Sequence, residues 1–482
     1  MRKTLIALAV LMVILTGLVM AQPLKETSIG CLEITVDGAN IEESGDDLVV
    51  LRAYKNLVTI DIESSCDQQL EFKIKNLRAS SVEVFGLEDY EVLSPTSISF
   101  IWSNDIDGHI EFRDEGVGIE SFSFIAMGDN RDGPETFQAI MNEVDDEQYA
   151  FCVNTGDIVP SGRASQFEEF MGWIEDLSIP FYISIGNHEL SNNSADLATS
   201  YVGDPDFSFD YGNTHFVVID NSLSVVRDEQ YQWMRDDILS SDKPNLVMVC
   251  HVPPYDPREG DSHCLTGDDA EEFKLFAAEM GADLVLNGHI HLYDEEEFYG
   301  VEYIITGGAG APLYATEANG GFFHYVICTI EGDEITHEVV KVTSPLYTPE
   351  IAQENKQRAQ DKVDHSLDNY DSMQEKIREL EAKGKDVEVL QNNLNRAKTK
   401  YDMSMDQLES SIDHFGNEYY RECVTSAQSA YTYAEQGDLI IENLEDDIAE
   451  MSKDGGFKNI YLYVGIFVAI LAILAAALFK KK

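Results

Sequence analysis

The chain has 482 residues, of which 44% are apolar and 10% aromatic, and it carries 33 Lys and Arg against 88 Asp and Glu, for a formal net charge of −55. This length suggests about three folded units and excludes a single small domain, and the apolar content is too high for a disordered acidic tail. General binding of nucleic acids or anionic membranes is also excluded, because it requires clusters of Lys and Arg, which this chain lacks outside its two ends.

The N-terminus has the pattern of a secretory signal peptide. Arg2 and Lys3 precede the apolar run 4–20, and the small residue Ala21 ends it before Gln22. We therefore expect residues 1–22 to be a signal peptide. An uncleaved N-terminal anchor is the alternative, and it would leave the bulk of the chain on the same, outer side of the membrane.

Residues 23–115 are predicted to form a small β-sandwich. Apolar and polar residues alternate in short stretches such as 32–36 and 58–62, and Asp-Gly and Gly-Asp pairs interrupt them. Cys31 and Cys66 both fall in this region, where an oxidising compartment permits a disulfide between them. The seven cysteines include no CxxC pair, which argues against a zinc ribbon or a thioredoxin-like site.

Residues 119–345 show fully apolar runs that alternate with helical stretches, a pattern typical of the buried strands of an α/β domain. A polar cluster follows each of five apolar runs. These clusters are Gly128-Asp129-Asn130-Arg131, Gly156-Asp157, Gly186-Asn187-His188-Glu189, Cys250-His251 and Asn287-Gly288-His289-Ile290-His291. Ligands bind outside the carboxyl ends of the strands in such sheets, so we expect the five clusters to meet in one place.

The residue types in these clusters predict a metal centre. Two Asp, one Asn and three His side chains crowded together are stable only around cations, because unpaired carboxylates repel one another. Mixed oxygen and imidazole donors suit Mn, Fe, Zn, Co or Ni better than Ca or Mg. Six side chains are too many for one catalytic ion with an open position, but they fit two divalent metal ions that activate a hydroxide for attack on a phosphoryl group.

The five clusters, in this order, resemble those of the calcineurin-like metallophosphoesterase family over about residues 119–342. The resemblance implies a two-sheet β-sandwich flanked by helices, with a dinuclear metal centre at one edge. It also implies the ligand set: Asp129 and His291 for the first ion, Asp157 bridging both ions, and Asn187, His251 and His289 for the second.

The resemblance also implies roles for residues that do not bind metal. His188 would contact the phosphate or protonate the leaving group. Many family members have Asp-x-His in the first cluster, whereas here Arg131 stands at the third position; its guanidinium suits phosphate capture, and a structural salt bridge is the alternative. Pro160 replaces the tyrosine of the purple acid phosphatase branch, which argues against a tyrosinate-coloured iron site. His263 is a further candidate for contact with the substrate.

Residues 346–456 are predicted to form a helical, coiled-coil-like stalk. Apolar residues recur every three or four positions along 387–415 and 427–451, and Gly384 and Gly416 mark helix ends, so we expect three helices. The glycine breaks favour a bundle folded back on itself. An intermolecular coiled coil that makes a homo-oligomer is the alternative.

Residues 460–479 are an uninterrupted apolar run long enough to cross a bilayer as a helix. Tyr461 and Tyr463 lie where an interfacial aromatic belt would, and Lys480 to Lys482 close the chain in agreement with the positive-inside rule. This pattern predicts a single C-terminal transmembrane helix that anchors the protein in the cell membrane.

The sequence as a whole predicts a membrane-tethered, extracytoplasmic phosphoesterase that hydrolyses phosphate mono- or diesters. The alternative is a catalytically idle cell-surface scaffold or adhesion protein whose domain only binds metal, and Arg131 at a ligand position is its best support. Retention of all six other ligand positions and of His188 favours the enzyme.

Overall fold

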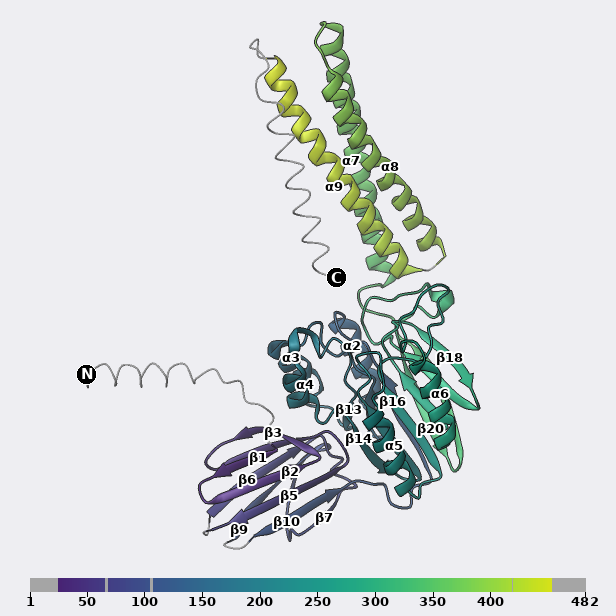
Figure 1. The fold of residues 1–482 in the computed structure, drawn as a ribbon. Helices are drawn as coiled ribbons and strands as arrows, with labels where there is room; N and C mark the ends of the chain where they lie inside the picture. Colours follow the sequence, from purple (N-terminus) through teal and green to yellow (C-terminus); the bar gives the residue numbers. More distant parts are fainter. Residues whose placement is uncertain (1–24, 66–67, 105–106, 418, 453–482) are drawn as a thin grey trace, which may run out of the picture. The chain divides into compact units, whose positions relative to one another are not determined.

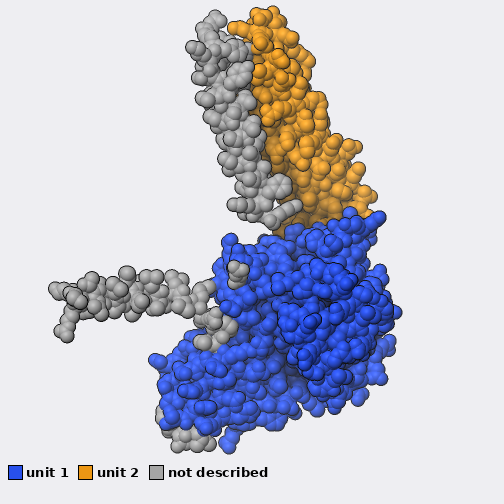
Figure 2. Space-filling view, viewed as in Figure 1, with its two compact units in different colours: residues 1–344 blue, residues 345–482 orange. Residues whose placement is uncertain are grey.

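The computed structural model describes residues 25–65, 68–104, 107–417 and 419–452. The predicted signal peptide (1–22) and the predicted transmembrane helix (460–479) lie outside these residues. Among the helices that the structure describes, none is both long enough and apolar enough to cross a bilayer. The chain divides into two compact units, residues 1–344 and 345–482 (Figure 2).

The first unit begins with a β-sandwich of two five-stranded sheets (Figure 1). One sheet has the order β1-β2-β5-β10-β7 and the other β3-β4-β6-β9-β8. The strands are β1 (Glu26–Ile29), β2 (Leu32–Asp37), β3 (Ala39–Ser44), β4 (Leu48–Ala53), β5 (Leu57–Ser64), β6 (Gln68–Lys75), β7 (Glu83–Phe85), β8 (Glu91–Ser94), β9 (Ser97–Asn104) and β10 (Gly108–Arg113). In β2 buried and exposed residues alternate strictly, and Ile34, Ile60 and Phe72 from both sheets share one core.

The remainder of the first unit is an α/β region with two further sheets, ordered β13-β12-β11-β20-β21 and β14-β15-β16-β17-β19-β18. Its elements are β11 (Ser121–Met127), α2 (Pro134–Val144), β12 (Cys152–Asn154), α3 (Ala164–Ile174), β13 (Phe181–Ile183), η1 (Ser191–Asn193), α4 (Ala195–Val202), β14 (Phe207–Tyr211), β15 (Thr214–Ile219), α5 (Asp228–Ser240), β16 (Asn245–Cys250), α6 (Asp269–Met280), β17 (Leu284–Asn287), β18 (Tyr293–Phe298), β19 (Val301–Thr306), η2 (Glu317–Asn319), β20 (His324–Glu331) and β21 (Glu334–Lys341).

The two sheets of the α/β region face each other across a shared core that includes Phe124, Phe151 and Phe216. All residues of β12, β13 and β16 are buried, which explains why these strands are mainly apolar and do not alternate. The family resemblance implied this two-sheet arrangement with flanking helices, and the structure agrees with it.

The β-sandwich packs against the α/β region through buried hydrogen bonds. Asn76, which is 7% exposed, accepts a hydrogen bond from the backbone N–H of Phe181 at 2.7 Å and donates one to its carbonyl at 2.9 Å. On the same side, the Tyr54 hydroxyl donates to Asp204 at 2.7 Å. Because Phe181 begins β13, these contacts hold the sandwich directly to a strand that leads to the predicted site.

The cysteines that the structure describes are either disulfide-bonded or free. Cys31 is disulfide-bonded, and Cys66, its predicted partner, lies outside the described residues. The five other cysteines are free, and among them Cys152 and Cys250 are buried within strands, where they act as small apolar residues.

The second unit contains three long helices in the part that the structure describes: α7 (Pro349–Ala382), α8 (Glu388–Gly416) and α9 (Tyr420–Ser452). Gly384, in the left-handed conformation with φ of 76°, follows the end of α7, in agreement with the predicted helix stop. Leu380, Leu394 and Leu444, one from each helix, pack in one core. The three helices therefore form a bundle within one chain.

Candidate metal centre

The predicted ligands lie at strand ends that meet at one edge of the α/β region. Asp129, Asp157 and Asn187 follow β11, β12 and β13, which run parallel in one sheet. His251 and His289 follow β16 and β17, which run parallel in the other sheet. The carboxyl ends of both sets of strands thus direct polar side chains to the same place, as the sequence predicts.

The backbone at this edge is held in an uncommon conformation. Asp129, Asp157 and His289 have φ values of 59°, 57° and 67°, a left-handed region that few residues other than glycine adopt. The neighbouring glycines are needed for close packing: a Cβ on Gly128 would lie 1.9 Å from Thr155 Oγ1, and one on Gly156 would lie 2.7 Å from the backbone nitrogen of Gly186. Strain of this kind concentrates at functional sites.

Nitrogen and oxygen atoms of His251, His289 and Asn187 that can act as metal ligands lie close to the carboxylate of Asp157. The His251 Nδ1 lies 2.9 Å from the carbonyl oxygen of Thr155, which can only accept, so Nδ1 carries a proton and Nε2 is the lone-pair atom of the neutral ring. Although burial alone would lower the pKa of His251, Asp157 and Asp129 raise it, so in the absence of a metal ion a proton can occupy the same position on Nε2. That Nε2 lies 3.1 Å from Asn187 Oδ1, 3.4 Å from Asp157 Oδ1 and 3.2 Å from His289 Nδ1. Even with a proton on His289 Nδ1, the Nε2 of His251 faces two oxygen acceptors.

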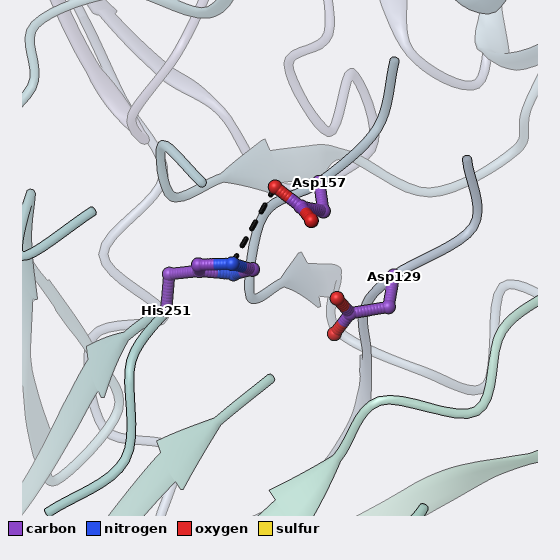
Figure 3. Close-up of side chains that lie close together, drawn as sticks. All are labelled: Asp129, Asp157 and His251. Atoms are coloured by element: carbon purple, nitrogen blue, oxygen red, sulfur yellow. Dashed lines mark ion pairs between the residues drawn. The ribbon is translucent and has the colours of Figure 1, made fainter. Parts of the chain in front are cut away.

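Asp129 and His291 repeat this arrangement. The His291 Nδ1 lies 2.7 Å from the carbonyl oxygen of Pro312, which again leaves Nε2 as an acceptor, and this Nε2 lies 3.3 Å from Asp129 Oδ1. Asp129 Oδ1 is buried and accepts no hydrogen bond, whereas its Oδ2 accepts the backbone N–H of His289 at 2.7 Å. Ligand atoms of Asp129, Asp157 and His251 all lie within 4.8 Å of one another (Figure 3). Acceptors that face acceptors fit a bound cation.

The electrostatics of the centre favour the ligand forms of Asp129 and His289. Although burial alone would raise the pKa of Asp129, the neighbouring His291, and positive charge on His251, hold it below its ordinary value. Burial and the neighbouring His251 lower the pKa of His289 to about 3, so its imidazole is neutral and free to donate a lone pair.

Glu189 joins two of the ligand loops, a role that sequence analysis did not identify. It is fully buried and accepts the backbone N–H groups of Asp157 at 2.8 Å, Gly186 at 2.7 Å and Val159 at 3.1 Å. Burial and the nearby Asp157 raise the pKa of Glu189. It thus holds the loops that carry Asp157 and Asn187 in register.

Arg131 and His188 lie beside the bridging carboxylate. Arg131 Nε is 3.2 Å from Asp157 Oδ2, its Nη1 is 2.8 Å from Asp132 Oδ2, and its Nη2 is 3.4 Å from His291 Nε2. His188 donates from Nδ1 to the carbonyl of Pro160 at 2.6 Å, and its Nε2 lies 3.9 Å from Asp157 Oδ2. A salt bridge of Arg131 is therefore present, and phosphate capture by this residue stays a prediction.

His263 lies at the rim of the centre, together with residues that the sequence gave no reason to select. Its ring is 5.8 Å from that of His289, and its Nδ1 lies 2.8 Å from Arg258 Nη2. Tyr314 stacks on His291 with 4.0 Å between ring centroids, and the Arg258 guanidinium lies 5.3 Å from the Tyr314 ring. Tyr314 and Arg258 come from loops without a recognisable motif, so only their placement in space reveals them.

Residues 122–293 match the family model of the calcineurin-like phosphoesterases. Purple acid phosphatase 15 of Arabidopsis thaliana is 27% identical over 170 residues, which are 30% of this chain and 30% of that protein. Purple acid phosphatase 5 of the same plant is 24% identical over 219 residues, covering 42% of this chain and 53% of that protein. A 3',5'-cyclic-nucleotide phosphodiesterase of Nostoc is 23% identical over 180 residues, covering 35% of this chain and 67% of that protein.

Among solved structures, a purple acid phosphatase from yellow lupin (Lupinus luteus) seeds aligns with a TM-score of 0.44 and 15% identity, covering 59% of this chain and 70% of that chain. The chain thus spans about a third to about half of the length of the first two relatives. The family match confirms the predicted resemblance and, for the domain, the predicted class of metal-dependent phosphoester hydrolases with two divalent ions. The role of each individual residue stays a prediction.

Proposed function

Because residues 122–293 form a calcineurin-like phosphoesterase domain, we propose that the whole chain is a metal-dependent phosphoesterase that acts on phosphate mono- or diesters outside the cytoplasm. The observation that carries the proposal is the pairing of acceptors with acceptors: the Nε2 atoms of His251 and His291 face the carboxylates of Asp157 and Asp129 at 3.4 and 3.3 Å. Such an arrangement of neutral imidazoles and carboxylates is unfavourable unless a metal ion, or a proton in its place, lies between them.

The residues divide into two ligand groups around the shared Asp157. Asn187, His251 and His289 would hold one ion, and Asp129 and His291 would hold the other. When bound, two divalent ions would neutralise charge on the phosphoryl oxygens and would lower the pKa of water, so that hydroxide is available at neutral pH. Thr155 and Pro312 keep His251 and His291 in the tautomer that such ligands require.

His188 is placed to move a proton at the leaving oxygen of the ester. Its Nδ1–H is committed to Pro160, so Nε2 is the atom that can take up or release a proton. Its backbone N–H donates to Asp157 Oδ1 at 2.9 Å, and its side chain is 26% exposed, so Nε2 borders both the ligand group and solvent. This position suits a group that meets substrate at the edge of the centre.

The proposed location has support from the ends of the sequence and from one covalent bond. The signal-peptide and transmembrane patterns at 1–22 and 460–479 predict a C-terminal cell-membrane anchor with the catalytic domain outside. Cys31 is disulfide-bonded, which an oxidising compartment permits. Protease added to intact cells should digest residues 25–452 if this topology is correct; protection of that segment would contradict it.

The activity is tested with the full-length chain loaded with Mn²⁺ or Zn²⁺ and supplied with p-nitrophenyl phosphate and bis-p-nitrophenyl phosphate. Both esters are needed because the relatives include purple acid phosphatases and cyclic nucleotide phosphodiesterases. We expect turnover of at least one ester and its loss on chelation. Bound metal without turnover of any phosphate ester would instead support the idle scaffold.

A further inference from the structure

Arg131 contacts one side of the shared Asp157 but not the other. Its guanidinium lies 3.2 Å from Asp157 Oδ2 and 3.4 Å from the Nε2 of His291, whereas Asp157 Oδ1 lies 3.4 Å from the Nε2 of His251. In the described part of the chain, no Lys or Arg side chain hydrogen-bonds or pairs with Asn187, His251 or His289. The fixed positive charge of Arg131 therefore lies on the Asp129–His291 side of the shared carboxylate.

The position of Arg131 is well supported by its surroundings. Its backbone N–H donates to the carbonyl of Asp157 at 3.1 Å, and its Nη1 pairs with Asp132 at 2.8 Å. The side chain is 12% exposed, so its ion pair with Asp157 is largely shielded from solvent. A guanidinium does not lose its proton in proteins, so the charge is permanent.

The positive charge of Arg131 disfavours a metal ion at the neighbouring ligands. Asp129 and Asp157 bring two negative charges, which two divalent ions already exceed, and Arg131, although paired with Asp132, places a further positive charge at the donor atoms of one ion. Like charges within a few ångströms repel strongly in a buried site. An ion at Asp129, Asp157 Oδ2 and His291 must therefore displace the guanidinium. An ion at Asn187, His251 and His289 could use Asp157 Oδ1, the oxygen on the side of His251, without displacing it.

We propose that Arg131 is an internal cation that competes with a divalent ion for the Asp129–His291 position, so that the two ion positions differ in affinity. This deepens the proposed function and rests on its metal centre. The ion at Asn187, His251 and His289 binds tightly, and the ion at Asp129 and His291 binds weakly. The fraction of molecules with an ion at Asp129 and His291 therefore depends on the concentration of free metal ion.

The test is a calorimetric titration of the full-length chain, stripped of metal, with Mn²⁺ alone. The wild type should show two binding steps whose dissociation constants differ at least tenfold. Arg131→Ala should tighten the weaker step at least tenfold and leave the tighter step within twofold. Arg131→His, which restores the Asp-x-His spacing, should tighten the weaker step further because it adds an imidazole ligand. Arg131→Met, which keeps the apolar stem, replaces Arg131→Ala if that variant does not fold.

Arg235→Ala is the matched control, because it also removes one positive charge from the first unit. Arg235 is 41% exposed and pairs with Glu279 at 3.0 Å on the surface, so its loss should leave both steps unchanged. Two equal steps in the wild type, or a weaker step in Arg131→Ala within twofold of the wild-type value, would overturn the proposal.

The failure of this inference can be told from the failure of the proposed function. If the predicted pattern of Mn²⁺ affinities is found but no phosphate ester is hydrolysed, the proposed activity is wrong and the competition stands. If esters are hydrolysed but Arg131→Ala and Arg131→Met bind Mn²⁺ as the wild type does, the competition is wrong and the activity stands.

Discussion

Carboxylates largely shielded from solvent occur in both units, but their surroundings differ. In the helical unit, Asp438 accepts hydrogen bonds from the hydroxyls of Ser366 and Tyr401, both at 2.9 Å, and pairs with Lys362 at 2.8 Å. In the α/β region, Asp129 Oδ2 accepts one backbone N–H, but its buried Oδ1 accepts no hydrogen bond and lies 3.3 Å from Nε2 of His291. A carboxylate whose oxygens both meet donors is structurally complete, whereas one with a buried oxygen that no donor reaches is suited to a metal ion.

An Asp-to-Asn substitution in each unit should distinguish a carboxylate that binds metal from one that only stabilises the fold. Asp157→Asn removes the charge shared by both ligand groups, and we expect turnover of p-nitrophenyl esters to fall by more than about 100-fold, since loss of groups that merely orient metal ligands already costs 10- to 100-fold. Asp438→Asn should leave turnover unchanged. Steady-state kinetics of both variants check this, and a similar loss in both would erase the distinction.

Divalent ions should stabilise one region and not the other. Binding to the folded state alone stabilises by about 3 kcal/mol when the free ion is 100-fold above its dissociation constant. Hydrogen-exchange mass spectrometry with Mn²⁺ and with a chelator should show slower exchange with metal in residues 122–344 and no change in residues 349–452. Equal protection of both regions would show that the ion acts elsewhere.

Removing the carboxylate of Asp438 should change hydrogen exchange in the helical unit and leave it unchanged in the α/β region. Asp438→Ala leaves Lys362, Ser366 and Tyr401 without their partner, and we expect the helical unit to lose about 1–3 kcal/mol of stability. Hydrogen exchange over 349–452 measures this loss. Wild-type exchange in this variant would mean that the donors find water or other partners.

A smaller effect is expected from His215, a buried histidine that the α/β region uses for structure. Burial alone would lower its pKa, but hydrogen bonds to Asp210 at 2.6 Å and Asp237 at 3.1 Å raise it to about 9. Because the folded pKa exceeds the unfolded value of about 6.5, this pairing stabilises the fold fully below pH 6.5 and is lost as the pH rises through about 9.

We expect this pH-dependent contribution to be about 1–2 kcal/mol. Urea unfolding of the wild type and His215→Gln at pH 6 and pH 10 measures it: the difference between the two proteins should shrink at pH 10. A difference that is the same at both pH values would show that His215 contributes by packing alone.

Much of the centre is predictable from the sequence because its residues follow apolar strands. The pairs Gly128-Asp129 and Gly156-Asp157 stand close after such runs, and strand ends in α/β sheets converge. The left-handed conformation of Asp129 and Asp157 themselves, in contrast, is not encoded in this pattern. Period-two patterning likewise predicted the β-sandwich but not which strands share a sheet.

Other features depend on contacts between distant segments, which no local pattern encodes. Tyr314 reaches His291 from a loop after β19, and Asn76 reaches Phe181 from the β-sandwich. The ion pairs of Arg131 depend on the loop of Asp157, so the sequence left phosphate capture and a salt bridge as alternatives. Such contacts arise only when the sheets pack.

Anomalous diffraction at the manganese edge, from crystals of the protein soaked in Mn²⁺, tests the metal centre most directly. We expect one strong peak among Asp157, Asn187, His251 and His289, and a second peak, weaker at low Mn²⁺, between Asp129, Asp157 and His291. Absence of any peak within bonding distance of Asp157 at saturating Mn²⁺ would show that these residues do not form a metal centre.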